Sequence, residues 1–441
     1  MAVIIESSVW EPNPWLYILL FMASLFSLLA FPYASKKYSI TTRTPTIFDH
    51  GISSSSSSSS SFLRFQRNFL LLYSLASVLE GLWSAFGEVE FAYYGVRREQ
   101  IVLSLCIGSA AALLFGTFVG VLSDLIGQKK VCLLFCILHL FIGLWKRIVP
   151  HPNILVAGIC LSLSASIFSF SFETWMVVQH EKQGHRQDTL NETFWLMSFF
   201  ESASLIGSQV LSNWLIGNNV GKNISSPSMA AFFFAIIAIV CITKGWAEVP
   251  KTASFKEYRT SFSSYVLGVF WILWAPTVVA DGREVHLGLI YPCLVGSRML
   301  GSTVFPWLTG GLSSIRTEDY LVYAFIIVGM LLSITAYDYQ EIGVLVTLFC
   351  LFHASVGLIS PSLAKLRTMY VPNELRGGMI SLSQAPATAA ILFFLVQRGY
   401  YRNIENSTIM GIAALGLFTA AACMHVLKRW GKQPYQNWHK S

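Results

Sequence analysis

The sequence predicts an all-α polytopic membrane protein, with twelve core transmembrane helices in two six-helix halves and one extra helix at the N-terminus. Hydrophobic residues make up 54% of the 441 residues and charged residues only 12%, about half the charged share of an ordinary soluble domain. Thirteen mostly apolar stretches can be marked, each long enough for the ~20 residues that cross a bilayer as a helix. The stretches lack the alternating pattern of barrel strands, so helices are favoured over a transmembrane β-barrel.

The first stretch, residues 15–33, stands apart from the others. The flank before it carries Glu6 and Glu11 and no base, whereas bases follow it, which favours an uncleaved anchor over a cleaved signal peptide. We therefore expect an N-terminal membrane anchor helix within residues 1–33. Residues 34–67 contain nine consecutive serines, and serine repeats gain little by folding, so we expect a disordered cytoplasmic linker there.

The other twelve stretches form two groups of six. We place them at 68–94, 101–122, 131–149, 153–179, 192–217, 229–247, 261–281, 286–311, 320–338, 341–362, 378–397 and 407–427. A cytoplasmic connection at 248–260 separates an N-terminal half, 68–247, from a C-terminal half, 261–427, and residues 428–441 form a cytoplasmic tail. Many secondary transporters have this layout, with the substrate site near mid-membrane between the halves. Channels and scaffold proteins stay open at this point.

The formal net charge of +7 reports orientation in the membrane. If the stretch at 68–94 starts in the cytoplasm, 21 Lys and Arg residues lie on the cytoplasmic side, eight lie on the other side, and Arg298 lies within a span. The positive-inside rule strongly favours this orientation. Asn223 and Asn406 begin glycosylation sequons in outer loops, whereas the sequon at Asn191 lies inside. Passage through the secretory route leaves plasma membrane and endomembrane both open.

The loop after the second core stretch carries a recognisable pattern. Residues 120–130 read GVLSDLIGQKK, and this run resembles the loop signature of the major facilitator superfamily. Gly120 and Gly127 permit close helix approach and a tight turn, while Asp124 can meet a helix N-terminus or a base across the gate. With Lys129 and Lys130, these residues are the predicted gating loop. The alternative is an ordinary cytoplasmic turn.

Three longer motifs narrow the resemblance. SFLRFQRN at 61–68, FETW at 172–175 and LRTMYVPNELR at 366–376 are similar to segments of the molybdate-anion transporter family within that superfamily. The resemblance implies movement of molybdate, a dianion, by alternating access. The chain departs from the family pattern at Gln384, Ser381 and Ser264. These departures favour an alternative, a transporter-derived membrane binding or scaffold protein without transport activity.

Ionisable residues inside spans are functional candidates, because each costs about 3 kcal/mol at the centre of a bilayer unless it is paired or hydrated. Glu80, Glu173, Glu201 and Arg298 are such residues, and Glu88 and Glu90 bring the acids to five against one base. Arg298 is the obvious anion contact. The fifth and eighth core helices pack across the halves in the superfamily arrangement, so we expect Glu201 and Arg298 to pair. With Gln384, these residues are the predicted substrate-binding or coupling set.

The excess of acids suggests proton coupling through Glu80 or Glu173. Burial favours the neutral carboxyl group, which can then exchange protons as the cavity alternates. The alternative for both residues is a hydrogen bond that only packs helices. His139 and His353 also lie in spans, and we expect them to be satisfied core histidines because neither has an acid beside it in sequence.

The sequence carries no motif for an enzyme or a cofactor. It has no phosphate-binding Gly-x-x-x-x-Gly-Lys run and no metalloprotease helix pair. Its eight cysteines lie in or at the edges of spans, so we expect no disulfide framework. Cys132 and Cys136 share a helix face, and we expect them to pack as small apolar residues rather than to bind metal. The predicted partners are a small inorganic anion, protons and the lipid bilayer, with no nucleic acid.

Overall fold

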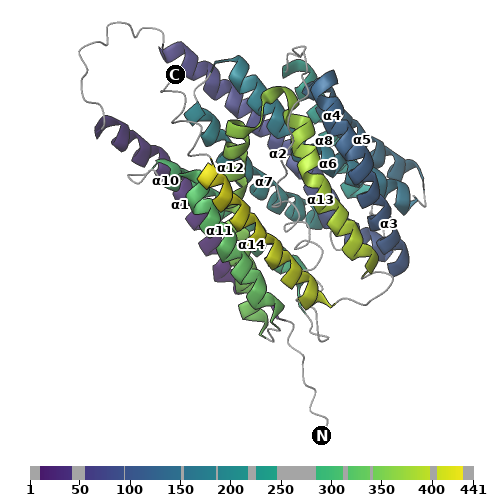
Figure 1. Cartoon of the computed structure of the whole chain (residues 1–441). Coiled ribbons are helices and arrows are strands. Elements are labelled where there is room, and N and C mark those ends of the chain that lie inside the picture. Colours follow the sequence, from purple (N-terminus) through teal and green to yellow (C-terminus); the bar gives the residue numbers. More distant parts are fainter. Residues whose placement is uncertain are drawn as a thin grey trace.

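The computed structural model describes residues 10–41, 55–93, 95–149, 153–184, 187–216, 225–245, 285–310, 316–337, 341–397 and 405–430. Within these ranges the elements are helices, apart from one isolated β-bridge between Trp10 and Val285. The helices are α1 (Pro14–Thr41), α2 (Ser55–Tyr93), α3 (Arg98–Ala111), the π-helical η1 (Ala112–Gly116), α4 (Thr117–Ile126), α5 (Gln128–Ile148), α6 (Ile154–Lys182), α7 (Gln187–Ile216), α8 (Ser225–Gly245), α10 (Leu287–Gly310), α11 (Thr317–Ala336), α12 (Ile342–Tyr370), the short η3 (Asn373–Leu375), α13 (Arg376–Val396) and α14 (Asn406–Trp430) (Figure 1).

The predicted stretches coincide with these helices, with α3, η1 and α4 together covering the one at 101–122. The stretch at 261–281 lies outside the described residues. In the described part of the chain, nine helical segments are long and apolar enough to cross a membrane. Helices α2 and α7 are not among the nine, and both carry an acid that is partly buried between helices, Glu80 and Glu201.

The expected disordered linker at 34–67 differs from the structure where it is described. Helix α1 continues to Thr41 and α2 begins at Ser55, while residues 42–54 lie outside the described part. The start of α2 is held by aromatic contacts with α6: the ring centroids of Phe62 and His180 are 5.7 Å apart, and those of Phe65 and Trp175 are 5.8 Å apart. These aromatic residues follow the serine repeat, and their burial extends the helix toward it.

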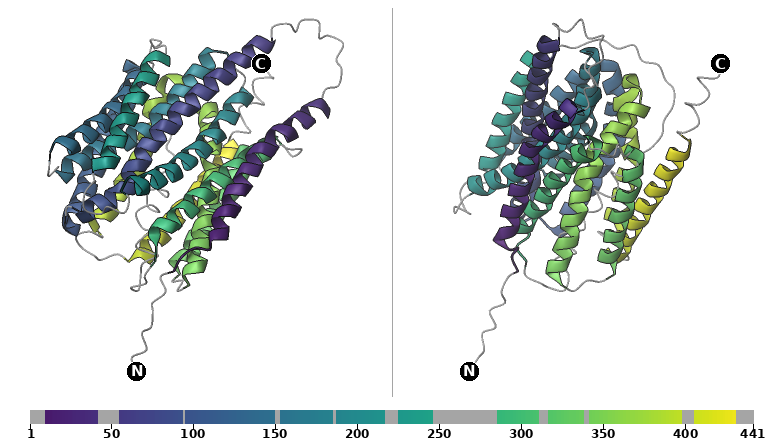
Figure 2. Two further views of the ribbon diagram at one scale, coloured as in Figure 1. Left: turned by 180° about the vertical axis from the view of Figure 1, so that it is seen from behind. Right: turned by 90° about the vertical axis from the view of Figure 1, so that its left-hand side faces the viewer.

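Buried apolar side chains form two large clusters. One joins α2, α5, α6, α7 and α8 and also includes Ala364 of α12 and Ile380 of α13, and the other joins α10, α11, α12, α13 and α14. The two groups of helices meet where α7 packs on α10 and where α4 packs on α13, and Figure 2 shows them side by side from two further directions. The six-and-six division stays a prediction, because the connection at 248–260 lies outside the described residues.

Helix α10 is held from two sides. On one side lies α1, where Tyr17 Oη donates to the carbonyl oxygen of Leu289 at 2.6 Å and Ser27 Oγ accepts from Trp307 Nε1 at 3.1 Å (Figure 1). On the other side lies α7. Pro292 has no N–H for the carbonyl oxygen of Gly288 four residues earlier, and Gln209 Nε2 of α7 donates to that oxygen at 2.8 Å. These contacts fix the backbone on both sides of Arg298.

Candidate functional site

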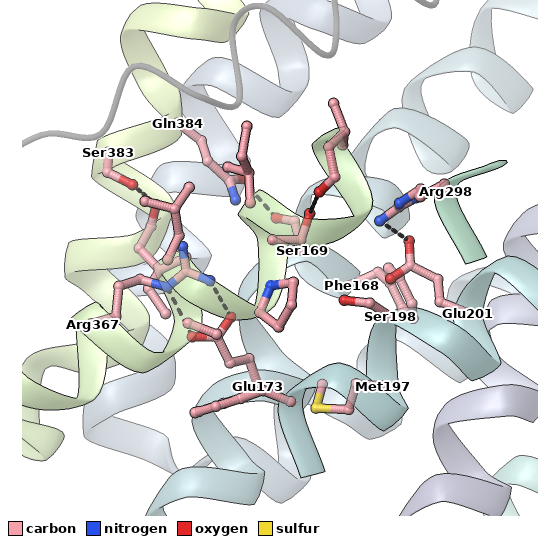
Figure 3. A pocket seen from close by; sticks show the side chains of 18 of the residues that line it. Phe168, Ser169, Glu173, Met197, Ser198, Glu201, Arg298, Arg367, Ser383 and Gln384 are labelled. Carbon is pink, nitrogen blue, oxygen red and sulfur yellow. Dashed lines mark hydrogen bonds and ion pairs between the residues drawn. The ribbon is translucent and has the colours of Figure 1, made fainter. Parts of the chain in front are cut away.

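A cavity of about 270 Å³ lies between the two groups of helices. Its polar lining comes from α2, α6 and α7 on one side and from α10, α12 and α13 on the other (Figure 3). The polar or charged lining residues are Tyr73, Ser169, Glu173, Ser198, Glu201, Arg298, Ser360, Arg367, Ser383 and Gln384. Between them the wall is apolar, with residues such as Phe168, Phe194, Met197, Phe352 and Val356.

Arg298 and Glu201 form an ion pair at one end of this wall. Arg298 Nη2 lies 3.0 Å from Glu201 Oε1, and the two side chains are 9% and 19% exposed. Tyr73 Oη donates to the other carboxylate oxygen, Oε2, at 2.8 Å. Arg298 Nε is buried and has no hydrogen-bond partner among the described residues. The predicted pairing of Glu201 with Arg298 is therefore confirmed.

Glu173 lies in a second ion pair, across the gap between α6 and α12. Arg367 donates from Nε to Glu173 Oε1 at 2.9 Å and from Nη2 to Oε2 at 2.5 Å, which is the two-pronged geometry that makes arginine–carboxylate pairs strong. Arg376 Nη1, on a fully buried side chain, lies 3.8 Å from Glu173 Oε1. Glu173 therefore contacts two guanidinium groups.

Gln384 also lines the cavity. Its Oε1 accepts a hydrogen bond from Ser169 Oγ of α6 at 2.7 Å (Figure 3), so this contact also bridges the two groups of helices. The Gln384 amide supplies N–H donors that a bound anion could accept from.

Glu80 lies outside the set of residues that line the cavity. Its Oε1 is 3.2 Å from His139 Nε2 of α5, and the His139 side chain is fully buried. The prediction that His139 is a satisfied core histidine rests on its neighbours in sequence, whereas its partner Glu80 lies 59 residues away. Glu80 is therefore paired within the first group of helices, away from the other predicted site residues.

The predicted gating loop is a sharp corner between α4 and α5. Gly127 forms the corner with φ of 100°, a conformation that favours glycine. The Asp124 carboxylate accepts from the backbone N–H groups of Gly377 and Gly378 at 3.0 and 2.7 Å, in the first turn of α13. The predicted meeting of this acid with a helix N-terminus is confirmed, and it joins the two groups of helices.

Two further residues support the corner. Gln128 Nε2 donates to Asp124 Oδ1 at 3.1 Å, a role that no sequence motif indicated. A Cβ atom on Gly120 would lie 1.9 Å from Ser381 Oγ, so only glycine allows α4 and α13 to approach this closely. Lys129 and Lys130 lie in the first turn of α5. We call Asp124 with Gly377 and Gly378 the cytoplasmic latch, because the predicted orientation puts them at the cytoplasmic end.

The excess of acid inside the membrane is smaller than the sequence count suggests. The 21 bases assigned to the cytoplasmic side include Arg367 and Arg376, yet both contact Glu173. With Glu201 paired to Arg298 as well, the charged groups that line the cavity balance one another. The sequence could not indicate this, because the bases lie at helix ends next to a polar turn and far along the chain from their partners.

Some predicted residues cannot be placed at the site. Asn223 and Ser264 lie outside the described residues, as do the side chains of Glu88 and Glu90. Asn406 is the first residue of α14. Its role as a glycosylation acceptor stays a prediction.

Comparisons with known proteins agree with the fold. A family model described as twelve-span sugar transporters of the major facilitator superfamily matches residues 45–265. The molybdate-anion transporter of Xenopus tropicalis is 22% identical over 396 residues, covering 82% of this chain and 85% of that protein. The one from Takifugu rubripes is 23% identical over 386 residues, covering 76% and 79%.

Solved structures agree as well. A bacterial homologue of the iron transporter ferroportin, in an outward-facing state, superposes with a TM-score of 0.63 at 15% identity, covering 83% of this chain and 99% of that one. This likeness concerns the fold alone. The apolar helices and the family match identify a multi-pass integral membrane protein. The chain belongs to the twelve-span transporter family of the major facilitator superfamily that this model describes, and molybdate-anion transporters are its relatives.

Proposed function

We propose that this protein is a secondary active transporter that moves molybdate or a related small anion across a membrane by alternating access. The observation that carries the proposal is a cavity between the two groups of helices with two guanidinium groups, Arg298 and Arg367, in its wall. Guanidinium groups present paired N–H donors that match the oxygens of an oxyanion. The names of the molybdate-anion transporters among the relatives support the substrate class.

Alternating access requires contacts that hold one side closed and then break. The cytoplasmic latch is one such contact, and the pair of Glu173 with Arg367 is another. A third joins Glu181 of α6 to Asn373 in η3. We propose that these contacts hold the cytoplasmic side closed and separate when the cavity opens to the cytoplasm.

Proton coupling is part of the proposal, since a balanced cavity gains a positive charge for each carboxylate that takes a proton. Glu80 and Glu173 are the candidates from the sequence. Glu173 lies in the cavity wall, but two guanidinium groups stabilise its charged form. Glu80 faces a histidine rather than the cavity.

The second candidate function is a binding or scaffold protein without transport. The observation in its favour is that the cavity's own acids already pair with both of its arginines. Molybdate uptake, measured as the molybdenum content of the cells, separates the two functions when cells that lack the protein are compared with cells that express it. Transport predicts uptake that is restored by the wild-type chain and not by Arg298→Ala at equal membrane expression. A wild-type chain that reaches the membrane and restores no uptake would favour the scaffold.

A further inference from the structure

We infer that Arg298 binds the oxyanion and that the Glu201 carboxylate must take a proton before the anion can bind. This inference rests on the proposed function and deepens it. Before the anion arrives, Glu201 forms an ion pair with Arg298. The transported anion and one proton then enter together. The inference assigns the coupling role to Glu201, in place of Glu80 or Glu173.

The two arginines in the cavity wall differ in what their N–H groups do. Both Nε and Nη2 of Arg367 donate to Glu173, so this edge of the guanidinium is fully used. Arg298 instead touches Glu201 through Nη2 alone, at 3.0 Å. Its Nε is buried and finds no hydrogen-bond partner in the part of the chain that the structure describes, although a buried unsatisfied donor costs about 1–3 kcal/mol.

A tetrahedral oxyanion would satisfy the unused donor. Two of its oxygens can accept from Nε–H and Nη2–H of Arg298 together, which is the two-pronged geometry that Arg367 already makes with Glu173. Of those two donors, Nη2 contacts Glu201 in the structure. Anion binding therefore requires Glu201 to give up its contact with Nη2.

A proton on Glu201 Oε1 would release Arg298 without disturbing the rest of the site. The new O–H bond removes the negative charge and places hydrogen on the oxygen that faces Nη2. The other oxygen, Oε2, is then a carbonyl that still accepts from Tyr73 Oη, now at 2.8 Å. After the anion leaves on the far side, Glu201 returns the proton to water and the pair with Arg298 forms again.

The charged and titratable groups around Glu201 favour this assignment. Helices α2, α8, α10 and α12 pack against α7, and Glu173 of α6 lines the same cavity. The groups that these elements present to the Glu201–Arg298 pair are Tyr73 of α2, Tyr291 of α10, His353 of α12 and Glu173 of α6. Among the described residues Glu173 has two guanidinium partners, whereas Glu201 has one. Of the two acids that line the cavity, Glu201 is therefore the one with fewer guanidinium groups to stabilise its charged form.

The test is molybdate binding to the purified full-length chain between pH 6 and pH 8, by equilibrium dialysis with elemental molybdenum analysis. If one proton accompanies each anion, wild-type affinity falls about tenfold per pH unit on the alkaline side. Glu201→Gln keeps the size of the side chain and one oxygen that accepts hydrogen bonds, but it removes the charge. The affinity of this variant for molybdate should therefore not change with pH. Protonation of molybdate itself would affect both proteins alike.

Two further variants complete the test. Arg298→Gln in the Glu201→Gln background leaves no unpaired charge and should lose binding. Asp319→Asn alters an ion pair with Lys428, between α11 and α14 and outside the cavity, and should keep the wild-type pH dependence. A wild-type affinity that is independent of pH, or a Glu201→Gln affinity that falls with pH as wild type does, would overturn the inference alone. No molybdate binding by the wild type at any pH would overturn the proposed substrate as well.

Discussion

Replacing Asp124 by asparagine tests the cytoplasmic latch. The carboxylate is 3% exposed and accepts from two backbone N–H groups at the start of α13, at 3.0 and 2.7 Å. Asparagine has one oxygen, so it can accept from one N–H group while its own amide faces the other. The substitution also removes a negative charge from a helix N-terminus, where such a charge is stabilising. The contact joins α4 to α13, so its loss should weaken only conformations in which the latch is closed.

The expected magnitude follows from these contacts. A hydrogen bond to a charged group contributes about 1.5–3 kcal/mol, and the variant loses one of two. A loss of about 2 kcal/mol shifts the equilibrium between latched and open conformations about thirtyfold toward the open one. A latch that is closed in nearly all molecules would then be open in a fraction large enough to detect.

The assay is a distance distribution between spin labels on the two sides of the latch. Lys130 in α5 and Glu374 in η3 are both exposed and suit labelling as cysteines. The exposed Cys241 and Cys423 would first be replaced by serine. We expect a longer-distance population to appear in Asp124→Asn that is absent or minor in the parent.

The matched control is Asp319→Asn, the same chemical change in an ion pair that joins α11 to α14 within one group of helices. It should leave the distance distribution unchanged. Distributions that are identical in the parent and in Asp124→Asn would refute the role assigned to the latch.

Three further predictions follow from the same contacts. Gly120→Ala should also lengthen the spin-label distance, because the new Cβ would lie 1.9 Å from Ser381 Oγ. The control Gly411→Ala should not, since nothing lies within 4 Å of its new Cβ. Equal distances in the two variants would count against close packing of α4 on α13 at Gly120. Glu173→Gln leaves the buried Arg376 and the partly buried Arg367 without their carboxylate and should destabilise the chain by about 3 kcal/mol. This would be seen as a lower thermal unfolding temperature, and an unchanged temperature would show that the pair is not stabilising. Glu80→Gln should leave the pH dependence of molybdate binding as in wild type, because Glu80 pairs with a histidine away from the cavity, and a loss of that dependence would move the coupling role to Glu80.

The fold follows from the sequence because the bilayer imposes a strong rule on it. Every described spanning helix needs a run of apolar residues, and such runs are visible in the sequence without knowledge of any contact. The start of α2 was harder to predict. A serine repeat by itself favours disorder, and the aromatic contacts that hold the helix beside it come from α6, far along the chain.

The candidate site could be predicted only in part, since its residues are recognisable alone and their partners are not. Glu201 and Arg298 were identifiable as charges within apolar stretches, and the superfamily arrangement indicated that they pair. Arg367 and Tyr73 could not be identified in this way, because bases are common at helix ends and tyrosines are common in spans. Their roles depend on distances of 2.9 and 2.8 Å to acids that are 194 and 128 residues away in sequence.

A transporter of this kind carries its anion across the membrane through the cavity around Arg298. The most direct measurement is the initial rate of molybdenum accumulation in liposomes that contain the purified chain, with a more acidic medium outside than inside. Our account predicts a rate well above that of protein-free liposomes, which the double variant Glu201→Gln with Arg298→Gln abolishes. A wild-type rate equal to that of protein-free liposomes, or full activity in the double variant, would contradict it.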